Sequence, residues 1–244
     1  MSLLRRLWRG CEDVVFPPGC VRCLGVVEGG PYRQLCAHCA RLLAFIREPC
    51  CPLCGHPLPR AEEERLRCCP HCEDPAPAFG AARAAVLLSG PARELLHELK
   101  YRGGRHLLGD IEEVFRRAPA LLAHARGAVL VPVPLHPRKR RERGFNQSEL
   151  IAAALARAAG GGPPVRRLLR RDADTPSQTR LGREARRENL KNAFALRPGA
   201  RFDPALRYLL VDDVFTTGST LDGCARALRQ AGCLNLGAAA FGHG

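Results

Sequence analysis

The spacing of hydrophobic positions changes about one third of the way along the chain. Up to residue 80 these positions are scattered among cysteines, prolines and short polar turns, and no long periodic segment forms. From residue 81 short apolar runs alternate with segments whose apolar residues recur every three or four positions. We therefore predict a small region at 1–80, with a helix at its start, and an α/β domain at 81–244.

The second region has the pattern of a parallel sheet flanked by helices. The expected strands are 82–89, 128–134, 193–196, 207–213 and 234–241. The expected helices are 90–101, a pattern through 111–122, 146–161 and 219–232. The runs AVLVPVP and RYLLVDD are apolar without alternation, which is typical of parallel strands buried on both faces.

The first residues, MSLLRRLWRGCEDVVF, place arginines where a signal peptide needs an apolar stretch. They instead predict a short amphipathic helix with Leu3, Leu4, Leu7 and Trp8 on one face. Nowhere does an apolar run approach the roughly 18–20 residues that a membrane span requires. We expect a cytoplasmic protein with no membrane span.

Cysteine is the most unusual feature of the composition. Of the 13 cysteines, 11 lie in the first 72 residues, and such clustering without an export signal favours metal over disulfides. Eight of them form four Cys-x2-Cys pairs: Cys20 with Cys23, Cys36 with Cys39, Cys51 with Cys54, and Cys69 with Cys72. The gaps of 12 and 14 residues within successive couples are those of zinc ribbons.

We expect two structural zinc ions, each held by two successive pairs. A cross-braced arrangement, first pair with third and second with fourth, is equally compatible with the spacing. Four thiolates leave no open coordination position, so catalysis at these sites is not expected.

Net charge is also uneven. The chain carries +14 in total, of which 1–80 holds 10 basic and 9 acidic residues and 81–244 holds 28 and 15. A basic domain favours phosphorylated partners, small or polymeric. Only three of the basic residues are lysines, so the base composition of the coding DNA is a competing explanation for the arginines.

The segment LLVDDVFTTGST carries the clearest chemistry. An apolar strand ends in two carboxylates, and a Thr/Gly/Ser loop then begins a helix. Such a loop presents backbone N–H groups and hydroxyls to a phosphate at the positive end of the helix dipole. The neighbouring carboxylates suit ribose hydroxyls or Mg2+. The competing interpretation is an acidic strand end and a capped helix with no ligand.

This segment resembles the signature of type I phosphoribosyltransferases, whose ligand is 5-phosphoribosyl 1-pyrophosphate (PRPP). The resemblance implies that Asp212 and Asp213 contact the ribose hydroxyls, with Mg2+ accompanying PRPP. It also implies that the 5-phosphate is held by Thr216, Thr217, Gly218, Ser219 and Thr220.

A second resemblance narrows the family. The cysteine pairs, the segment VPVPLHPRKRRERGFNQSELIA at 131–152, and a later group of residues are similar to the ComF/GntX family. The later group is Gln178, Leu181, Arg186, Asn189 and Phe194. Members join an N-terminal double zinc ribbon to a phosphoribosyltransferase-like domain. In this family the strand ending at Pro134 would lead into a pyrophosphate loop, and 171–187 would form a mobile loop over the active site.

Basic side chains in these loops suit the charge that builds on a departing pyrophosphate. The candidates are Arg138, Arg140, Arg143 and Arg186. A solvated basic run is the competing interpretation for at least half of the arginines in this segment. No side chain stands out as a general base, so the acceptor and turnover itself stay open.

Three functions are compatible with these features. The leading hypothesis is a PRPP-binding protein of the phosphoribosyltransferase fold, as an active transferase or a binding protein, linked by its resemblance to DNA uptake in natural transformation. The second is a single-stranded-DNA-binding competence factor in which PRPP is an effector or is not turned over. The third is a scaffold whose zinc module docks a helicase-like competence protein, and the intact Asp-Asp and TTGST segments argue against it.

Overall fold

The structure is a computed structural model, and it describes residues 18–59, 69, 72, 77–101, 103–172 and 193–244. The amphipathic helix expected at the N-terminus lies outside these residues. Within the described part of the chain, no helix is both long and apolar enough to cross a membrane.

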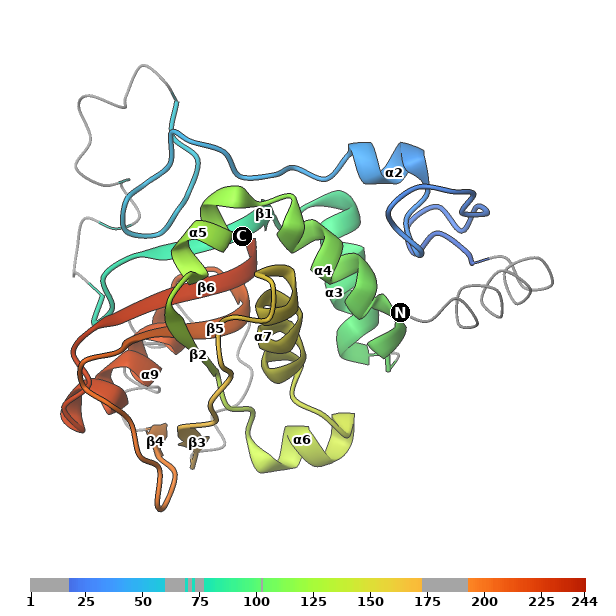
Figure 1. Cartoon of the computed structure of the whole chain (residues 1–244). Coiled ribbons are helices and arrows are strands. Elements are labelled where there is room, and N and C mark those ends of the chain that lie inside the picture. The colour runs from blue at the N-terminus through green and yellow to red at the C-terminus, as the bar shows by residue number, and fades with distance from the viewer. Residues whose placement is uncertain (1–17, 60–68, 70–71, 73–76, 102, 173–192) are drawn as a thin grey trace.

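A parallel sheet of four strands forms the centre of the molecule (Figure 1). The strands are β1 (Ala82–Leu87), β2 (Ala128–Pro132), β5 (Arg207–Phe215) and β6 (Leu236–His243), in the order β1-β6-β5-β2. In the register, Val211 of β5 lies beside Ala239 on one side and Pro132 on the other. The predicted parallel sheet is confirmed, because these apolar runs are buried on both faces.

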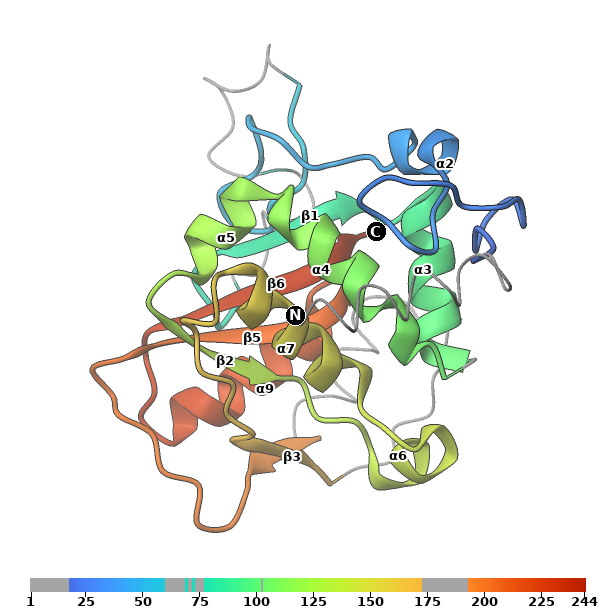
Figure 2. The same ribbon diagram turned by 45° about the vertical axis from the view of Figure 1, so that its right-hand side comes forward.

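Helices cover both faces of this sheet (Figures 1 and 2). One face carries α3 (Gly90–Tyr101), α4 (Leu108–Arg116), α5 (Pro119–Ala125) and α7 (Gln147–Ala158), with a short 3-10 turn at Arg105–Leu107, and the other carries α9 (Ser219–Gln230). Residues alternate along β5: Leu209 and Val211 belong to the core with α4 and α7, whereas Tyr208 and Leu210 belong to the core with α9. This alternation is the ordinary consequence of the strand pleat.

Two elements differ from the sequence-based expectation. The strand expected at 193–196 forms as β4 (Phe194–Leu196), but it pairs antiparallel with β3 (Leu169–Arg171) rather than joining the parallel sheet. Its side chain Phe194 packs into the core with α9, which places the pair beside the main sheet instead of within it.

The second difference is in the basic segment, which was expected as a loop. It contains a helix, α6 (Pro137–Arg143). Pro137 provides a favourable first position, the His136 side chain accepts a hydrogen bond from the Arg138 amide, and Gly144 ends the helix in a left-handed conformation.

The cysteine-rich region lies against the α/β core at two places. Residues Cys20, Leu35, Cys39 and Leu43 share a core with α3 and α4, while Ile46, Cys51 and Cys54 share the core with α9. Between them the chain pairs with the edge of the sheet, where the Ile46 amide donates to the Ala85 carbonyl at 3.0 Å. The division of the chain near residue 80 into two domains stays a prediction.

Candidate zinc centres and phosphate-binding site

The first group of four cysteines is brought together by a turn and a short helix. Cys20 and Cys23 lie in the turn, and Cys36 and Cys39 lie at the start of α2 (Ala37–Arg41). The Sγ atoms of Cys23 and Cys36 are 3.7 Å apart, and all four Sγ atoms lie within 4.8 Å of one another. Tetrahedral zinc with bonds of about 2.3 Å places its sulfurs about 3.8 Å apart, so this group fits the ion.

The second group has the same arrangement. Cys51, Cys54, Cys69 and Cys72 place their Sγ atoms within 4.8 Å of one another, with 3.5 Å between those of Cys54 and Cys69. Backbone amides support the sulfurs: that of His56 donates to Cys54 at 3.4 Å and that of Cys69 donates to Cys51 at 3.3 Å. The structure therefore pairs successive Cys-x2-Cys units and excludes the cross-braced alternative.

The thiols in each group do not share one ionisation state. Burial acts to raise the pKa of the Cys20 thiol, but backbone N–H groups that point at its sulfur outweigh burial and lower that pKa to about 6. The same balance lowers the pKa of Cys51 to about 7. Burial raises the pKa of Cys39 and of Cys72 to about 12. Four thiolates can therefore coexist here only with a cation between them, as zinc provides.

The two carboxylates predicted to contact ribose lie at the carboxyl end of β5. The Asp212 carboxylate accepts hydrogen bonds from the Ser148 hydroxyl and from the Asp213 amide, both at 2.9 Å. The buried Asp213 carboxylate forms an ion pair with the Lys100 ammonium at 2.7 Å. Burial raises the pKa of Asp212 to about 7, and the negative charge of Asp213 adds to this rise. A cation or hydroxyl donor at this point would favour the ionised pair.

The Thr/Gly/Ser loop follows directly. Residues 216–218 join β5 to α9, and Gly218 has φ +72° at the residue before the helix. A Cβ on Gly218 would lie 2.8 Å from the Phe215 ring, so both the backbone conformation and the space require glycine. The hydroxyls of Thr217 and Ser219 are 2.8 Å apart. The loop thus presents hydroxyls and the first amides of α9 on one side of the strand end.

The remaining loop residues are at the surface of this site. Thr216 is exposed, and Thr220 is partly exposed in the first turn of α9. The structure therefore brings Asp212, Asp213 and all five predicted phosphate-loop residues into one strand–loop–helix unit.

Two side chains of this site were not predicted. Lys100 comes from the end of α3, and Ser148 comes from the first turn of α7, whose N-cap is Asn146. The Asn146 side chain also donates to the Val133 carbonyl at 2.9 Å, which fixes the start of α7 against the end of β2. Ser148 carried no sequence signal, whereas Lys100 is one of only three lysines among 38 basic residues and could have been singled out.

The arginines predicted to bind pyrophosphate lie on α6. Arg138 pairs with Glu142 at 3.0 Å, and Arg140 approaches Glu149 at 3.7 Å. The Arg143 guanidinium lies 5.2 Å from the centre of the Tyr101 ring. The fourth candidate, Arg186, is outside the described residues.

A cavity of about 380 Å³ separates α6 from the β3–β4 pair, which lie at the same end of the molecule in Figures 1 and 2. Five arginines line it: Arg140, Arg167, Arg170, Arg171 and Arg197. The carboxylates of Glu149 and Asp172 also line it and offset part of this charge. A phosphate group would find several guanidinium groups within one hollow.

Comparison with known proteins agrees with this geometry. Residues 11–77 match the model of the double zinc ribbon domain. DNA utilization protein YhgH of Salmonella typhimurium is 31% identical over 206 residues, which cover 83% of this chain and 87% of that protein. The chain belongs to the ComF family.

Other members of the ComF family give consistent matches. Competence protein ComFC of Bacillus subtilis is 26% identical over 203 residues, covering 83% of this chain and 80% of that protein. Competence protein F of Haemophilus influenzae is 40% identical over 103 residues, and this match spans 42% of the chain and 44% of the relative. The match to the zinc ribbon model includes all eight cysteines of the two clusters.

Proposed function

We propose that this ComF protein binds PRPP with Mg2+ at the carboxyl end of β5 and transfers its phosphoribosyl group in a process of DNA uptake. The observation that carries the proposal is the strand–loop–helix unit, in which two carboxylates precede a loop with left-handed Gly218 at the N-terminus of α9. Ligands of open parallel sheets bind at this end of the strands.

Each part of the unit suits one part of PRPP. The 5-phosphate would accept hydrogen bonds from the first amides of α9 and from the hydroxyls of Thr217 and Ser219. Asp212 and Asp213 would accept hydrogen bonds from the ribose hydroxyls or hold Mg2+. Lys100 balances one negative charge at 2.7 Å from Asp213, which helps to keep the pair of carboxylates together before the ligand binds.

The pyrophosphate would then face α6 and the start of α7. During transfer the bond between C1 of the ribose and the pyrophosphate oxygen breaks, and a nucleophilic atom of the acceptor forms a new bond to C1. Negative charge builds on the departing pyrophosphate, and guanidinium groups with Mg2+ stabilise it. Arg140 and Arg143 are on the element that supplies this charge.

Calorimetric titration of the zinc-loaded protein with PRPP and Mg2+ tests the site. Asp213→Asn should abolish measurable binding, because it removes a charge that holds sugar or metal. Asp203→Asn is the matched control: it makes the same change at an exposed carboxylate just before the opposite end of β5. Equal affinity of both variants and the wild type would reject the assignment.

A second function, binding of single-stranded DNA, is favoured by the arginine-lined cavity. Sequence separates α6 from 166–171, yet both line the cavity together with Arg197. Two relatives are named for competence and one for DNA utilization, which agrees with a nucleic acid as partner. Phosphate contacts would dominate such binding, and affinity would fall steeply with salt.

Fluorescence anisotropy with a labelled oligonucleotide tests this second function. Charge reversal of Arg140 and Arg141 should weaken binding and reduce the salt dependence by about 0.7 per lost phosphate contact. Charge reversal of Arg126 and Arg229, both exposed and outside the cavity, is the control. Negligible affinity of the wild type at physiological salt would refute DNA binding, and competition by PRPP would place both ligands at one site.

Docking of a helicase-like competence protein stays a prediction from the resemblance alone.

A further inference from the structure

Three aromatic side chains connect the second zinc centre to the back of the phosphate loop. The ring of His56 lies 5.1 Å from that of His243, and the ring of His243 stacks on Phe215 at 5.1 Å with an angle of 27° between planes. The Phe215 ring in turn lies 2.8 Å from the position of a Cβ on Gly218. We call His56, His243 and Phe215 the aromatic stack.

Backbone hydrogen bonds fix both ends of the aromatic stack. At the zinc end, the His56 amide donates to the Cys54 sulfur at 3.4 Å, and the His56 carbonyl accepts from the Cys51 amide at 2.8 Å. At the loop end, Phe215 and His243 are partners in the register of β5 and β6. The orientation of His56 therefore depends on the turn between Cys51 and Cys54, which is the turn that zinc closes.

This zinc ribbon is seated closely on the edge of the sheet. The Ala82 amide donates to the Leu53 carbonyl at 2.7 Å, and the Arg83 side chain donates to the Pro52 carbonyl at 3.1 Å. Gly55 has φ +74°, and a Cβ there would lie 2.9 Å from the Ala82 carbonyl oxygen. Such close contact leaves the ribbon little room to shift without moving the aromatic stack.

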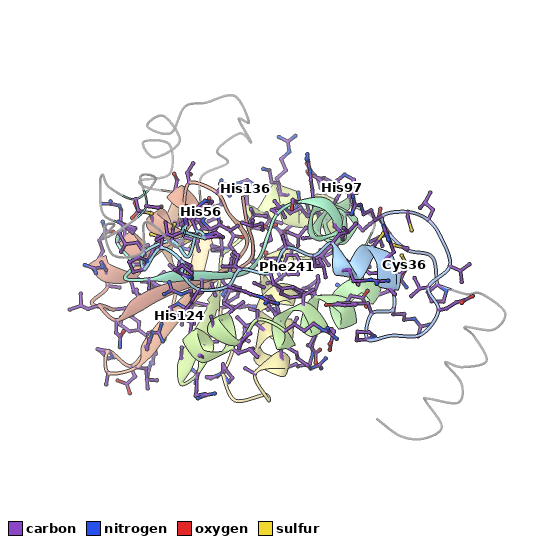
Figure 3. The ribbon with its side chains drawn as sticks, turned by 90° about the horizontal axis from the view of Figure 1, so that it is seen from above. Cys36, His56, His97, His124, His136 and Phe241 are labelled. Carbon is purple, nitrogen blue, oxygen red and sulfur yellow. The ribbon has the colours of Figure 1, made fainter. Side chains whose placement is uncertain are left out.

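The first zinc centre has no comparable connection within the described residues. Its ribbon is held to α4, where the buried Asp110 carboxylate accepts hydrogen bonds from the amides of Arg33 and Gln34 at 2.8 and 2.7 Å. Seen from above, Cys36 of this centre and His56 of the second lie at opposite sides of the molecule (Figure 3). The two centres therefore provide an internal comparison.

We propose that His243 and Phe215 are positioning residues for the phosphate loop, and that the second zinc centre holds them in place through His56. Zinc at the second centre would then set the affinity of the loop for a phosphate group, whereas zinc at the first would not. The identity of the phosphate ligand rests on the proposed function; the support of the loop does not.

A double-mutant cycle tests the stack, with ribose 5-phosphate and PRPP as probes and zinc content as a check on folding. His56→Ala and His243→Ala should each weaken phosphate binding by about two- to tenfold, the range of one aromatic pair. The double variant should be no weaker than the more affected single variant, because both changes interrupt one connection. His243→Phe retains a ring on Phe215 and should restore most of the affinity.

Several results would overturn the proposal. Unchanged affinity of His243→Ala with two zinc ions bound would show that the loop needs no support from this ring. Additive losses in the double variant would show that the two histidines act independently. Failure of His243→Phe to restore any affinity would show that the stacked ring is not what positions the loop.

A ligand-free measurement separates this proposal from the proposed function. Cys54→Ser should increase hydrogen exchange of the amides at 216–219, and Cys23→Ser, which removes a ligand of the first centre, should not. If the wild type binds neither probe but this difference is present, the PRPP assignment fails and the support of the loop stands. If PRPP binds and the two variants exchange alike, the support fails and the assignment stands.

Discussion

Asp212→Asn should make the folded protein more stable at neutral pH while it removes PRPP binding. The Asp212 carboxylate is buried beside Asp213, and its Oδ1 accepts hydrogen bonds from Ser148 and from the Asp213 amide. An asparagine has the same shape and its Oδ1 accepts the same two hydrogen bonds. The substitution therefore removes the negative charge and leaves the contacts.

The expected gain follows from the raised pKa of Asp212. Burial and Asp213 move this pKa from 3.8 to about 7. At about 1.4 kcal/mol for each tenfold change in proton affinity, the difference amounts to about 4 kcal/mol. The folded protein retains a proton that the unfolded chain releases, so this carboxyl lowers the free energy of unfolding as pH rises from about 4 to about 7.

Urea unfolding of zinc-loaded wild type and Asp212→Asn at several pH values provides the measurement. The variant should be more stable by about 2–4 kcal/mol near pH 8, and this gain should fall by about 2–3 kcal/mol near pH 5. Because zinc affinity itself decreases in acid, the two proteins are compared at each pH rather than across pH.

Glu142→Gln is the matched control for this experiment. Its carboxylate is exposed and pairs with Arg138 on the surface of α6, so neutralising it should change stability little at any pH. The reasoning is refuted if Asp212→Asn destabilises the protein near pH 8, or if its effect is the same at both pH values.

Three further changes have defined outcomes. Gly218→Ala should lower the free energy of unfolding by about 1–3 kcal/mol, because φ is +72° and the new Cβ would meet Phe215, and PRPP binding measured by calorimetry should be lost. Lys100→Met leaves Asp213 buried without its cation, so unfolding free energy should fall by about 1–3 kcal/mol, more near pH 8 than near pH 5; an equal loss at both pH values would contradict the role of the ion pair. Cys51→Ser should reduce zinc, determined by elemental analysis, from two ions per chain to one, and two ions in the purified variant would argue against this ligand set.

The local chemistry of the site could be read from the sequence because it is contiguous. Asp212, Asp213 and the loop to Thr220 lie within nine residues, and a strand followed by a glycine-containing loop and a helix has a local hydrophobic pattern. The parallel sheet was predictable for the same reason: its strands are apolar runs that only a doubly covered sheet can bury. Cysteine spacing predicted two zinc centres, but it was compatible with two ways of pairing.

Contacts between distant segments required the tertiary structure. Only the fold brings Cys54 near Cys69 rather than near the first two pairs, and only the fold places Lys100 beside Asp213, 113 residues further along the chain. The second zinc ribbon reaches the phosphate loop through His56 and His243, which lie almost at opposite ends of the sequence. Hydrophobic periodicity reports which residues are buried, but not which buried residues meet, because that depends on the order of strands in the sheet and on the faces that the helices cover.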